Sequence, residues 1–250
     1  MPPRQTPEPT PEQTPEQAPE QMPAEARVAA RGTAGVLVAG AVSLAGVLGL
    51  LVAEGRWRPL ERLDTRVAGD LHRAVAGHPA VIRALDWLAV AMEPGVYRAA
   101  IGLVAVVLWV RGWRRLAVWA VVLAAVGGAL GALLKYAVAR ARPVLPDPVA
   151  AAGGYSFPSG HALNSALCCG ILLVIAHRLL GRRAFTLAAT VAAVLVLVTG
   201  LDRIALGVHF VSDVVAGWFV AGTVIFGGLV AVRAERLTFR HAVRGGSARA

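Results

Sequence analysis

The sequence contains few of the residues that cross-link a fold covalently or through metal ions. Its only cysteines, Cys168 and Cys169, are adjacent, so they can neither join distant segments by a disulfide nor supply a tetrahedral metal site. We interpret them as small apolar packing residues. The sequence offers no other cluster of metal ligands, and we expect no metal ion and no cofactor.

The chain also has too few polar residues to cover a soluble domain of 250 residues, since 56% of them are hydrophobic and the mean hydropathy is +0.61. Segments of roughly 17 to 25 mainly apolar residues can cross a bilayer as helices. This pattern predicts an all-α fold, an integral membrane bundle of six transmembrane helices within residues 31–233. The predicted spans are 33–53, 94–113, 116–138, 161–180, 184–201 and 210–232.

Acidic residues are scarce as well, and the formal net charge of +10 raises the question of nucleic acid as a partner. The basic residues gather at the ends of apolar spans, as the positive-inside rule expects, which favours membrane lipids over nucleic acid as partners. Both termini are then cytoplasmic in a multi-pass protein of the cell (plasma) membrane. The groups are Arg27 and Arg31; Arg111, Arg114 and Arg115; Arg178, Arg182 and Arg183; and the arginines after residue 232.

The connection 54–93 is contrary evidence, because it carries six arginines on the side that this orientation places outside. Apolar residues repeat there at helical spacing, opposite the charges: Leu60, Leu63, Val67, Leu71 and Val75. That pattern predicts an amphipathic helix on the membrane surface, between the first and second spans.

Two polar tails flank the predicted membrane domain. Residues 1–30 begin with repeated Thr-Pro-Glu-Gln-like units that cannot bury a core, so we predict a disordered Pro/Glu/Gln-rich cytoplasmic tail. Residues 234–250 are predicted to form a basic cytoplasmic tail. The first span lacks a clear cleavage site and is expected to remain as an anchor.

Polar residues gather at span ends that the orientation above places on one outer face. They form three groups: Lys135 with Arg142-Pro143, then Pro158-Ser159-Gly160-His161, then Arg203 with His209 and Asp213. Charged groups inside a membrane are costly and usually face a functional cavity. The three groups therefore indicate one polar site on the extracytoplasmic side.

The cations and the Ser159-Gly160 turn of these groups have the composition of a phosphate-binding site. Lys135, Arg142 and Arg203 can neutralise a phosphate in a water-poor pocket. The Ser159-Gly160 turn starts a predicted helix, whose free N–H groups favour an anion. Lys135 is the only lysine of the chain, although a lysine near a helix end can also be a snorkelling anchor.

The third group has the spacing of an activated nucleophile. His209 and Asp213 are four residues apart, so on a helix the carboxylate can fix the ring and leave one nitrogen free to attack phosphorus. A structural His/Asp pair would have the same spacing. His161 is a second histidine, suited to protonating the departing oxygen.

In this order and spacing, Lys-x6-Arg-Pro, Pro-Ser-Gly-His and Arg-x5-His-x3-Asp resemble the signature of the type 2 phosphatidic acid phosphatase family, which is related to the vanadium haloperoxidases. The resemblance covers roughly residues 60–230. It implies a six-span helical bundle and a metal-independent hydrolase acting through a phosphohistidine. By this resemblance Lys135, Arg142, Ser159, Gly160 and Arg203 bind phosphate, while His209 is the nucleophile, Asp213 its partner and His161 the acid.

One residue departs from the family pattern, because Asp202 stands where relatives usually have serine. Its carboxylate either turns away, for example to pair with Arg203, or weakens phosphate binding. The first expected substrate is a polyprenyl diphosphate. Phosphatidylglycerophosphate and phosphatidate remain open, as do a lipid phosphotransferase and a catalytically silent transporter on the same bundle. The sequence does not indicate the oligomeric state.

Overall fold

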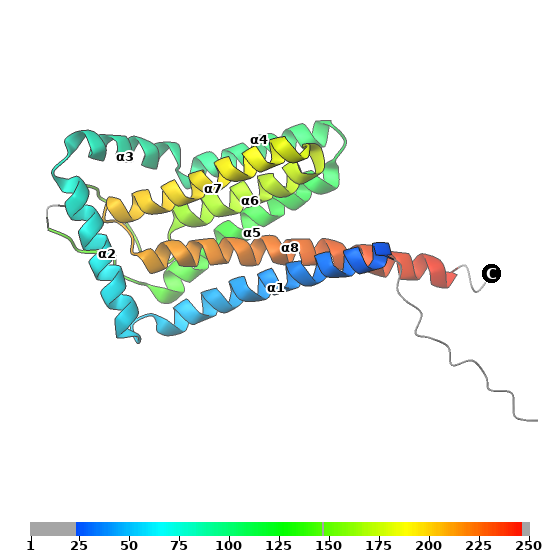
Figure 1. Cartoon of the computed structure of the whole chain (residues 1–250), viewed down its shortest axis with the longest axis horizontal. Helices are drawn as coiled ribbons and strands as arrows, with labels where there is room; N and C mark the ends of the chain where they lie inside the picture. Colours follow the sequence, from blue (N-terminus) through cyan, green and yellow to red (C-terminus); the bar gives the residue numbers. More distant parts are fainter. Residues whose placement is uncertain (1–23, 147, 247–250) are drawn as a thin grey trace, which may run out of the picture.

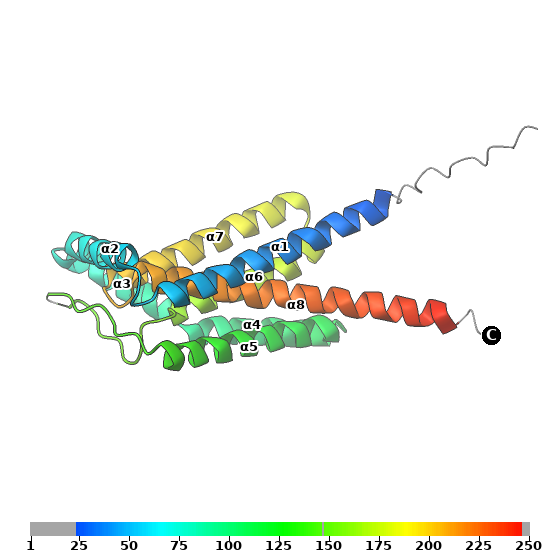
Figure 2. The ribbon, with the colours of Figure 1, turned by 90° about the horizontal axis from the view of Figure 1, so that it is seen from below.

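The computed structural model describes residues 24–146 and 148–246, and all regular elements within them are helices. Figures 1 and 2 show the long helices running side by side, with α2 lying across one end of the bundle. The all-α prediction is confirmed. The helices are α1 (Ala24–Ala53), α2 (Arg58–Ala76), α3 (Pro79–Ala91), α4 (Pro94–Val110), α5 (Arg114–Val138), α6 (Gly160–Leu179), α7 (Arg182–Ala205) and α8 (Val211–Gly246).

Most of the predicted N-terminal tail falls outside what the structure describes, whereas most of the predicted C-terminal tail belongs to a helix. Helix α1 begins at Ala24, inside the predicted tail 1–30, and the rest of that tail lies outside the described residues. At the other end, α8 continues to Gly246, well beyond the predicted start of the basic tail at residue 234. The disorder of the N-terminal repeats stays a prediction.

Six helical segments of the described chain are long and apolar enough to cross a bilayer, as predicted. Large apolar side chains cover their outer surface; Leu103, for example, is 68% exposed and Leu187 66%. An apolar surface of this extent is stable in lipid and unfavourable in water. The chain is therefore a multi-pass membrane protein. The segments are Gly32–Ala53, Pro79–Val110, Arg114–Val138, Gly160–Leu179, Arg182–Ala205 and Val211–Val232.

Residues 54–93, where one surface helix was predicted, contain two helices, and the second of them, α3, belongs to the apolar segment Pro79–Val110. Prolines in the first turn start α2, α3 and α4, because a proline there gives up only an N–H that would lack a helical partner anyway. Helix α3 is apolar and largely exposed, and it ends at Ala91, shortly before Pro94 begins α4. The second apolar segment is thus broken into two helices.

Helix α6 lies at the centre of the bundle and packs on α4, α5, α7 and α8. Glycines lie where α6 comes closest to its neighbouring helices α5 and α8. A Cβ at Gly127 of α5 would lie 2.3 Å from the Leu167 side chain, and one at Gly217 of α8 would lie 2.9 Å from the Ser159 carbonyl oxygen. The contact at Gly217 holds the first turn of α6 against the first turns of α8.

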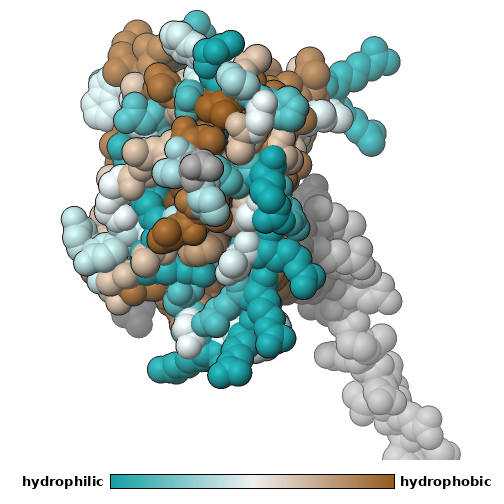
Figure 3. Space-filling view, turned by 90° about the vertical axis from the view of Figure 1, so that its left-hand side faces the viewer, coloured by the Kyte–Doolittle hydropathy of each residue, from teal (hydrophilic) through white to brown (hydrophobic). Residues whose placement is uncertain are grey.

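Helix α2 packs one face on α7 and α8. The residues that this face buries completely are Asp64, Ala68 and His72, at successive turns, while the predicted apolar residue Leu63 is 49% exposed. The helix is amphipathic as predicted, but its inward face includes buried polar groups. Seen from this end, the molecule shows many hydrophilic residues (Figure 3).

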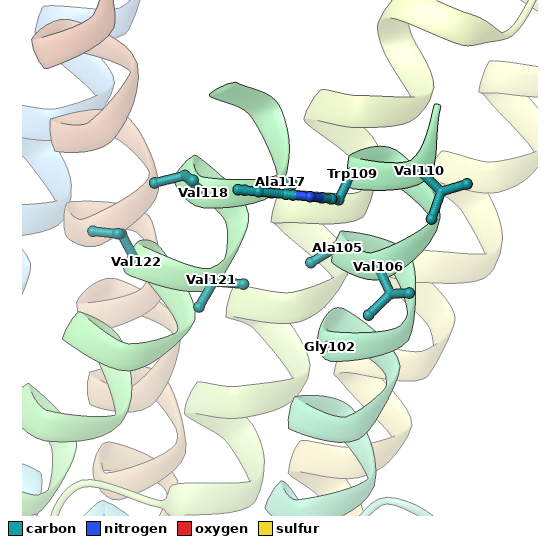
Figure 4. Close-up of a pocket in the computed structure, with 9 residues that line it drawn as sticks. All are labelled: Gly102, Ala105, Val106, Trp109, Val110, Ala117, Val118, Val121 and Val122. Atoms are coloured by element: carbon teal, nitrogen blue, oxygen red, sulfur yellow. The ribbon is translucent and has the colours of Figure 1, made fainter. Parts of the chain in front are cut away.

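A groove of about 420 Å³ lies between α4 and α5, toward the turn that joins them. Figure 4 shows that its lining is apolar, with the Trp109 ring lying across the groove. This turn is at the far end of α5 from Lys135, so the groove does not belong to the polar cluster predicted from the sequence.

Candidate active site

Segments far apart in the sequence meet at the α2 end of the bundle. The backbone N–H of Ser159 donates to the carbonyl of Asp213 at 2.9 Å, and that of His209 donates to the carbonyl of Arg203 at 3.3 Å. The N–H of Ser156 reaches the Arg140 carbonyl at 2.9 Å. The first bond joins the loop 139–159 to the start of α8, the second closes the turn between α7 and α8, and the third closes the loop on itself. The predicted site residues all lie at this junction: Lys135, Arg142, Ser159, Gly160, His161, Arg203, His209 and Asp213.

His209 is buried in the turn that precedes α8, and its Nε2 lies 3.2 Å from Nη1 of Arg142. A guanidinium can only donate, so Nε2 must be the acceptor and carries a lone pair. The ring proton is then on Nδ1. The hydrogen-bond geometry therefore assigns the tautomer that leaves Nε2 available for attack.

Asp213 lies on the Nδ1 side of this ring, as its spacing from His209 predicted. Its Oδ2 is 3.4 Å from Nδ1 and accepts the N–H of Phe210 at 2.8 Å. The hydroxyl of Ser156 donates to the same Oδ2 and lies 3.3 Å from Nδ1. The expectation that both residues of the pair sit on a helix is wrong for His209, which precedes Val211, the first residue of α8.

Burial controls the charge of His209. It lowers the pKa of the imidazole to about 4, against the opposing effect of Asp213. The ring is therefore neutral at pH 7, which is the form that a nucleophile requires.

Backbone carbonyls of the loop 139–159 hold two of the predicted cations. Arg142 donates from Nη2 to Gly153 at 2.9 Å and from Nε to Gly154 at 3.1 Å, while Lys135 donates to Tyr155 at 2.7 Å. Nη1 of Arg142 also donates to the Val208 carbonyl at 2.7 Å. The two positive groups are thus fixed beside His209 by neutral acceptors, which leaves their charge uncompensated by these contacts.

Arg203 is held differently, by the carboxylate that departs from the family pattern. Its Nε donates to Oδ2 of Asp202 at 2.7 Å, and its Nη2 contacts the same oxygen. The other oxygen, Oδ1, is buried without a hydrogen-bond partner. Of the two outcomes expected for Asp202, the structure shows the pair with Arg203, so this cation has a counter-ion before any phosphate arrives.

The start of α6 supplies fewer free N–H groups than expected. Ser159 caps the helix by accepting the N–H of Ala162 at 3.5 Å, but its own N–H already donates to Asp213. Within the described residues no protein group accepts the N–H of Gly160 or His161. A Cβ at Gly160 would meet nothing nearer than Pro94 Cγ at 4.0 Å, which leaves room there for an oxyanion.

The sequence analysis missed two residues of this site. Ser156 touches both His209 and Asp213. Arg140 makes ion pairs with Asp213 at 2.7 Å, Asp64 at 2.9 Å and Glu54 at 2.9 Å. Both residues stand within three positions of a recognised motif, and this proximity was the one feature of the sequence that could have suggested a role in the site.

The sequence profile of the PAP2 superfamily matches residues 115–237, a region that includes every predicted site residue. Phosphatidylglycerophosphatase B of Bacillus subtilis is 35% identical over 102 residues, which are 39% of this chain and 48% of the relative. The chain thus matches about half the length of that curated relative.

A solved structure shares the architecture. It is described as the crystal structure of the first transmembrane PAP2 type phosphatidylglycerolphosphate phosphatase, from Bacillus subtilis. The TM-score is 0.64 at 22% identity, over 79% of this chain and 96% of that chain. Over residues 115–237 the chain is therefore similar to the PAP2 superfamily, and it shares the fold of the solved transmembrane structure.

Proposed function

We propose that this protein is a membrane phosphatase that removes the terminal phosphate of a lipid phosphate through a covalent intermediate on His209. One observation carries the proposal. A buried imidazole, neutral at pH 7, has its Nε2 beside the Arg142 guanidinium and its Nδ1 beside Asp213. This is the arrangement of an oriented nucleophile next to a cationic phosphate site.

In the first step, Nε2 of His209 attacks phosphorus and the bond from phosphorus to the lipid oxygen breaks. Lys135, Arg142 and Arg203, with the N–H groups of Gly160 and His161, would stabilise the charge on the phosphoryl oxygens. Asp213 would stabilise the positive charge that the ring acquires when the N–P bond forms. The lipid leaves as an alcohol once its oxygen receives a proton.

His161 is the proposed donor of that proton. It occupies the second position of α6, is partly exposed, and lies close enough to Arg203 and His209 for their charges to act on it. In the second step, a water attacks the phosphohistidine, the N–P bond breaks, and neutral His161 takes a proton from that water. Orthophosphate is released and the resting enzyme returns.

The preferred substrate is phosphatidylglycerophosphate, because the curated relative is named a phosphatidylglycerophosphatase. Phosphatidylglycerophosphate thus replaces a polyprenyl diphosphate, the first substrate expected from the sequence, as the preferred choice. In this mechanism the site residues contact the phosphate and do not specify the lipid tail. The test therefore includes both phosphatidylglycerophosphate and a polyprenyl diphosphate. Phosphatidate is the third member of the panel.

The proposed orientation places the active site outside the cytoplasm. Both the start of α1 and the end of α8 lie at the end of the bundle opposite α2 (Figure 1). The arginine-rich turns between α4 and α5 and between α6 and α7 lie at that same end, which the positive-inside rule makes cytoplasmic. We expect a membrane-impermeant maleimide to label Arg66→Cys on intact cells and to leave Arg114→Cys unlabelled. The reverse pattern would invert the orientation.

The reaction is tested by incubating detergent-purified protein with the three lipids and measuring orthophosphate. Hydrolysis releases orthophosphate, a phosphotransferase yields a phosphorylated acceptor instead, and a transporter yields neither. We expect His209→Ala to lose nearly all turnover and acid-quenched wild type to contain a phosphohistidine. An active His209→Ala variant would refute the mechanism, and a wild type inactive on all three lipids would refute the proposed function.

A further inference from the structure

Arg140 is surrounded by acidic side chains from two helices and from the turn that follows a third. Its Nε pairs with Glu54 just after α1 at 2.9 Å, its Nη2 with Asp64 of α2 at 2.9 Å, and its Nη1 with Asp213 of α8 at 2.7 Å. The Phe210 ring lies 4.3 Å from Cζ and covers one face of the guanidinium. The side chain is only 10% exposed. Each of the three guanidinium nitrogens of Arg140 is therefore already paired with a carboxylate.

The contact with Asp213 controls how that carboxylate faces His209. Arg140 takes Oδ1, while the N–H of Phe210 and the hydroxyl of Ser156 converge on Oδ2 with the imidazole Nδ1. A carboxylate bound at both oxygens cannot rotate without breaking a charge-assisted bond. Oδ2 is thereby kept toward Nδ1, the side of the ring opposite the attacking nitrogen.

The other contacts of Arg140 tie this arrangement to α1 and α2. Asp64 is fully buried and also accepts the N–H of Ser212 at 2.9 Å and the Ser212 hydroxyl. Burial alone would lower the pKa of Arg140, but Asp213, Asp64 and Glu54 raise it, so the guanidinium stays charged. One permanent cation thus joins α2, α8 and the turn after α1 directly behind the nucleophile.

We propose that Arg140 is a positioning residue for the phosphatase reaction: it orients Asp213, and through Asp213 the ring of His209, by anchoring that carboxylate to Glu54 and Asp64. The inference rests on the proposed function, because it takes His209 as the nucleophile. It assigns different tasks to two arginines only two residues apart. Arg142 faces the phosphate, whereas Arg140 acts from behind the imidazole.

The test compares Arg140→Gln with Arg142→Gln, a matched pair of charge removals. For Arg140→Gln we expect kcat to fall about 10- to 100-fold, the usual loss for a group that orients a functional side chain from behind. KM and the Kd for orthophosphate, measured as ligand-dependent thermal stabilisation, should stay within about twofold of wild type. For Arg142→Gln the orthophosphate Kd should rise markedly. An equal rise in both variants, or an unchanged kcat in Arg140→Gln, would overturn the inference.

Arg140→Gln leaves two buried carboxylates, Asp64 and Asp213, without their cation and can fail to fold. Arg140→Lys keeps the charge but cannot reach Asp64, Glu54 and Asp213 together, so its kcat should lie between those of wild type and the Gln variant. The Arg140→Lys substitution is made in wild type and in the Asp213→Asn variant, and kcat is measured for each. We expect Arg140→Lys to lower kcat in wild type and to change it very little in Asp213→Asn, because the contact between residues 140 and 213 is already weakened there. The same fold-loss in both backgrounds would mean that Arg140 does not act through Asp213.

The outcome is separable from that of the proposed function. If wild type releases no orthophosphate from the three lipids, the proposed function fails, whatever the variants do. If wild type is active and forms a phosphohistidine while the Arg140 variants match its kcat, only the positioning role fails.

Discussion

Arg142 Nη1 donates a hydrogen bond of 3.2 Å to Nε2 of His209, the nitrogen proposed to attack phosphorus. This bond must break before Nε2 can attack. The same Nη1 donates to the Val208 carbonyl, in the turn that carries His209. In the empty site Arg142 fixes the ring and its tautomer. With substrate bound, the guanidinium can turn its donors to the phosphoryl oxygens and free the lone pair.

Replacing Arg142 by lysine tests whether this geometry matters beyond charge. A lysine supplies a compact point charge and cannot satisfy Gly153, Gly154, Val208 and a phosphate together. We expect kcat/KM for Arg142→Lys to fall by about 10²- to 10³-fold, the range found when one transition-state donor is lost. Arg66→Lys, on the exposed side of α2, is the control and should match wild type. Near-normal kcat/KM in Arg142→Lys would show that a positive charge is sufficient.

Asp202 competes with phosphate for Arg203. Since the carboxylate already accepts from Nε and Nη2, a phosphate must displace it or share the guanidinium. Asp202→Ser restores the residue usual in the family and should lower the Kd for orthophosphate by about 10-fold, equivalent to about 1.4 kcal/mol. Asp202→Asn, which removes the charge but keeps the shape, should give part of this gain. Weaker phosphate binding in both variants would mean that Asp202 orients Arg203 for the substrate.

Ser156 bridges the two residues of the His/Asp pair, and its removal should reduce turnover more than binding. Ser156→Ala leaves Nδ1 with only the 3.4 Å contact to Asp213. We expect kcat to fall about 10-fold, near the lower end of the losses usual for a supporting group, with KM little changed. Ser165→Ala is a matched control, because Ser165 is also buried and bonds only the Ala162 carbonyl, at 3.0 Å. A comparable kcat loss in both variants would indicate a general packing effect.

The membrane architecture and the motif residues could be predicted because each depends on local sequence. Long apolar runs require a helix in lipid, and the motif residues from Lys135 to Asp213 stand at or near the ends of those runs. The break between α3 and α4 was also visible, since Pro94 begins the second predicted span. The extra helix α3 was not foreseen, because an apolar stretch this short does not distinguish a spanning helix from a surface helix.

Arg140 and Ser156 could not be assigned from the sequence for a different reason. Their roles depend on which way a loop turns after α5, and Ala139 there adopts a left-handed conformation with φ of 50° that nothing in its residue type indicates. Asp64 was missed because it lies on the apolar face of α2, where a charge is explained only by a partner 76 residues away in the sequence, Arg140. Such long-range pairs appear only when the helices are assembled.

The pH dependence of kcat/KM tests the charge state of the nucleophile. Burial lowers the pKa of His209 to about 4, so the ring remains neutral and able to attack as the pH falls through the range in which an ordinary histidine, with a pKa near 6.5, becomes protonated. The acid limb should therefore lie near pH 4, and the alkaline limb should report the loss of the proton that His161 is proposed to donate. We compare kcat/KM of wild type and of His161→Ala from about pH 3.5 to 8.5. The ratio of wild type to variant cancels the ionisation of the substrate phosphate, which affects both equally. This ratio should fall toward alkaline pH and should not fall toward acid pH. An acid limb in wild type at pH 6 to 7 that is absent from the substrate's own titration would show that His209 is not desolvated in the working enzyme.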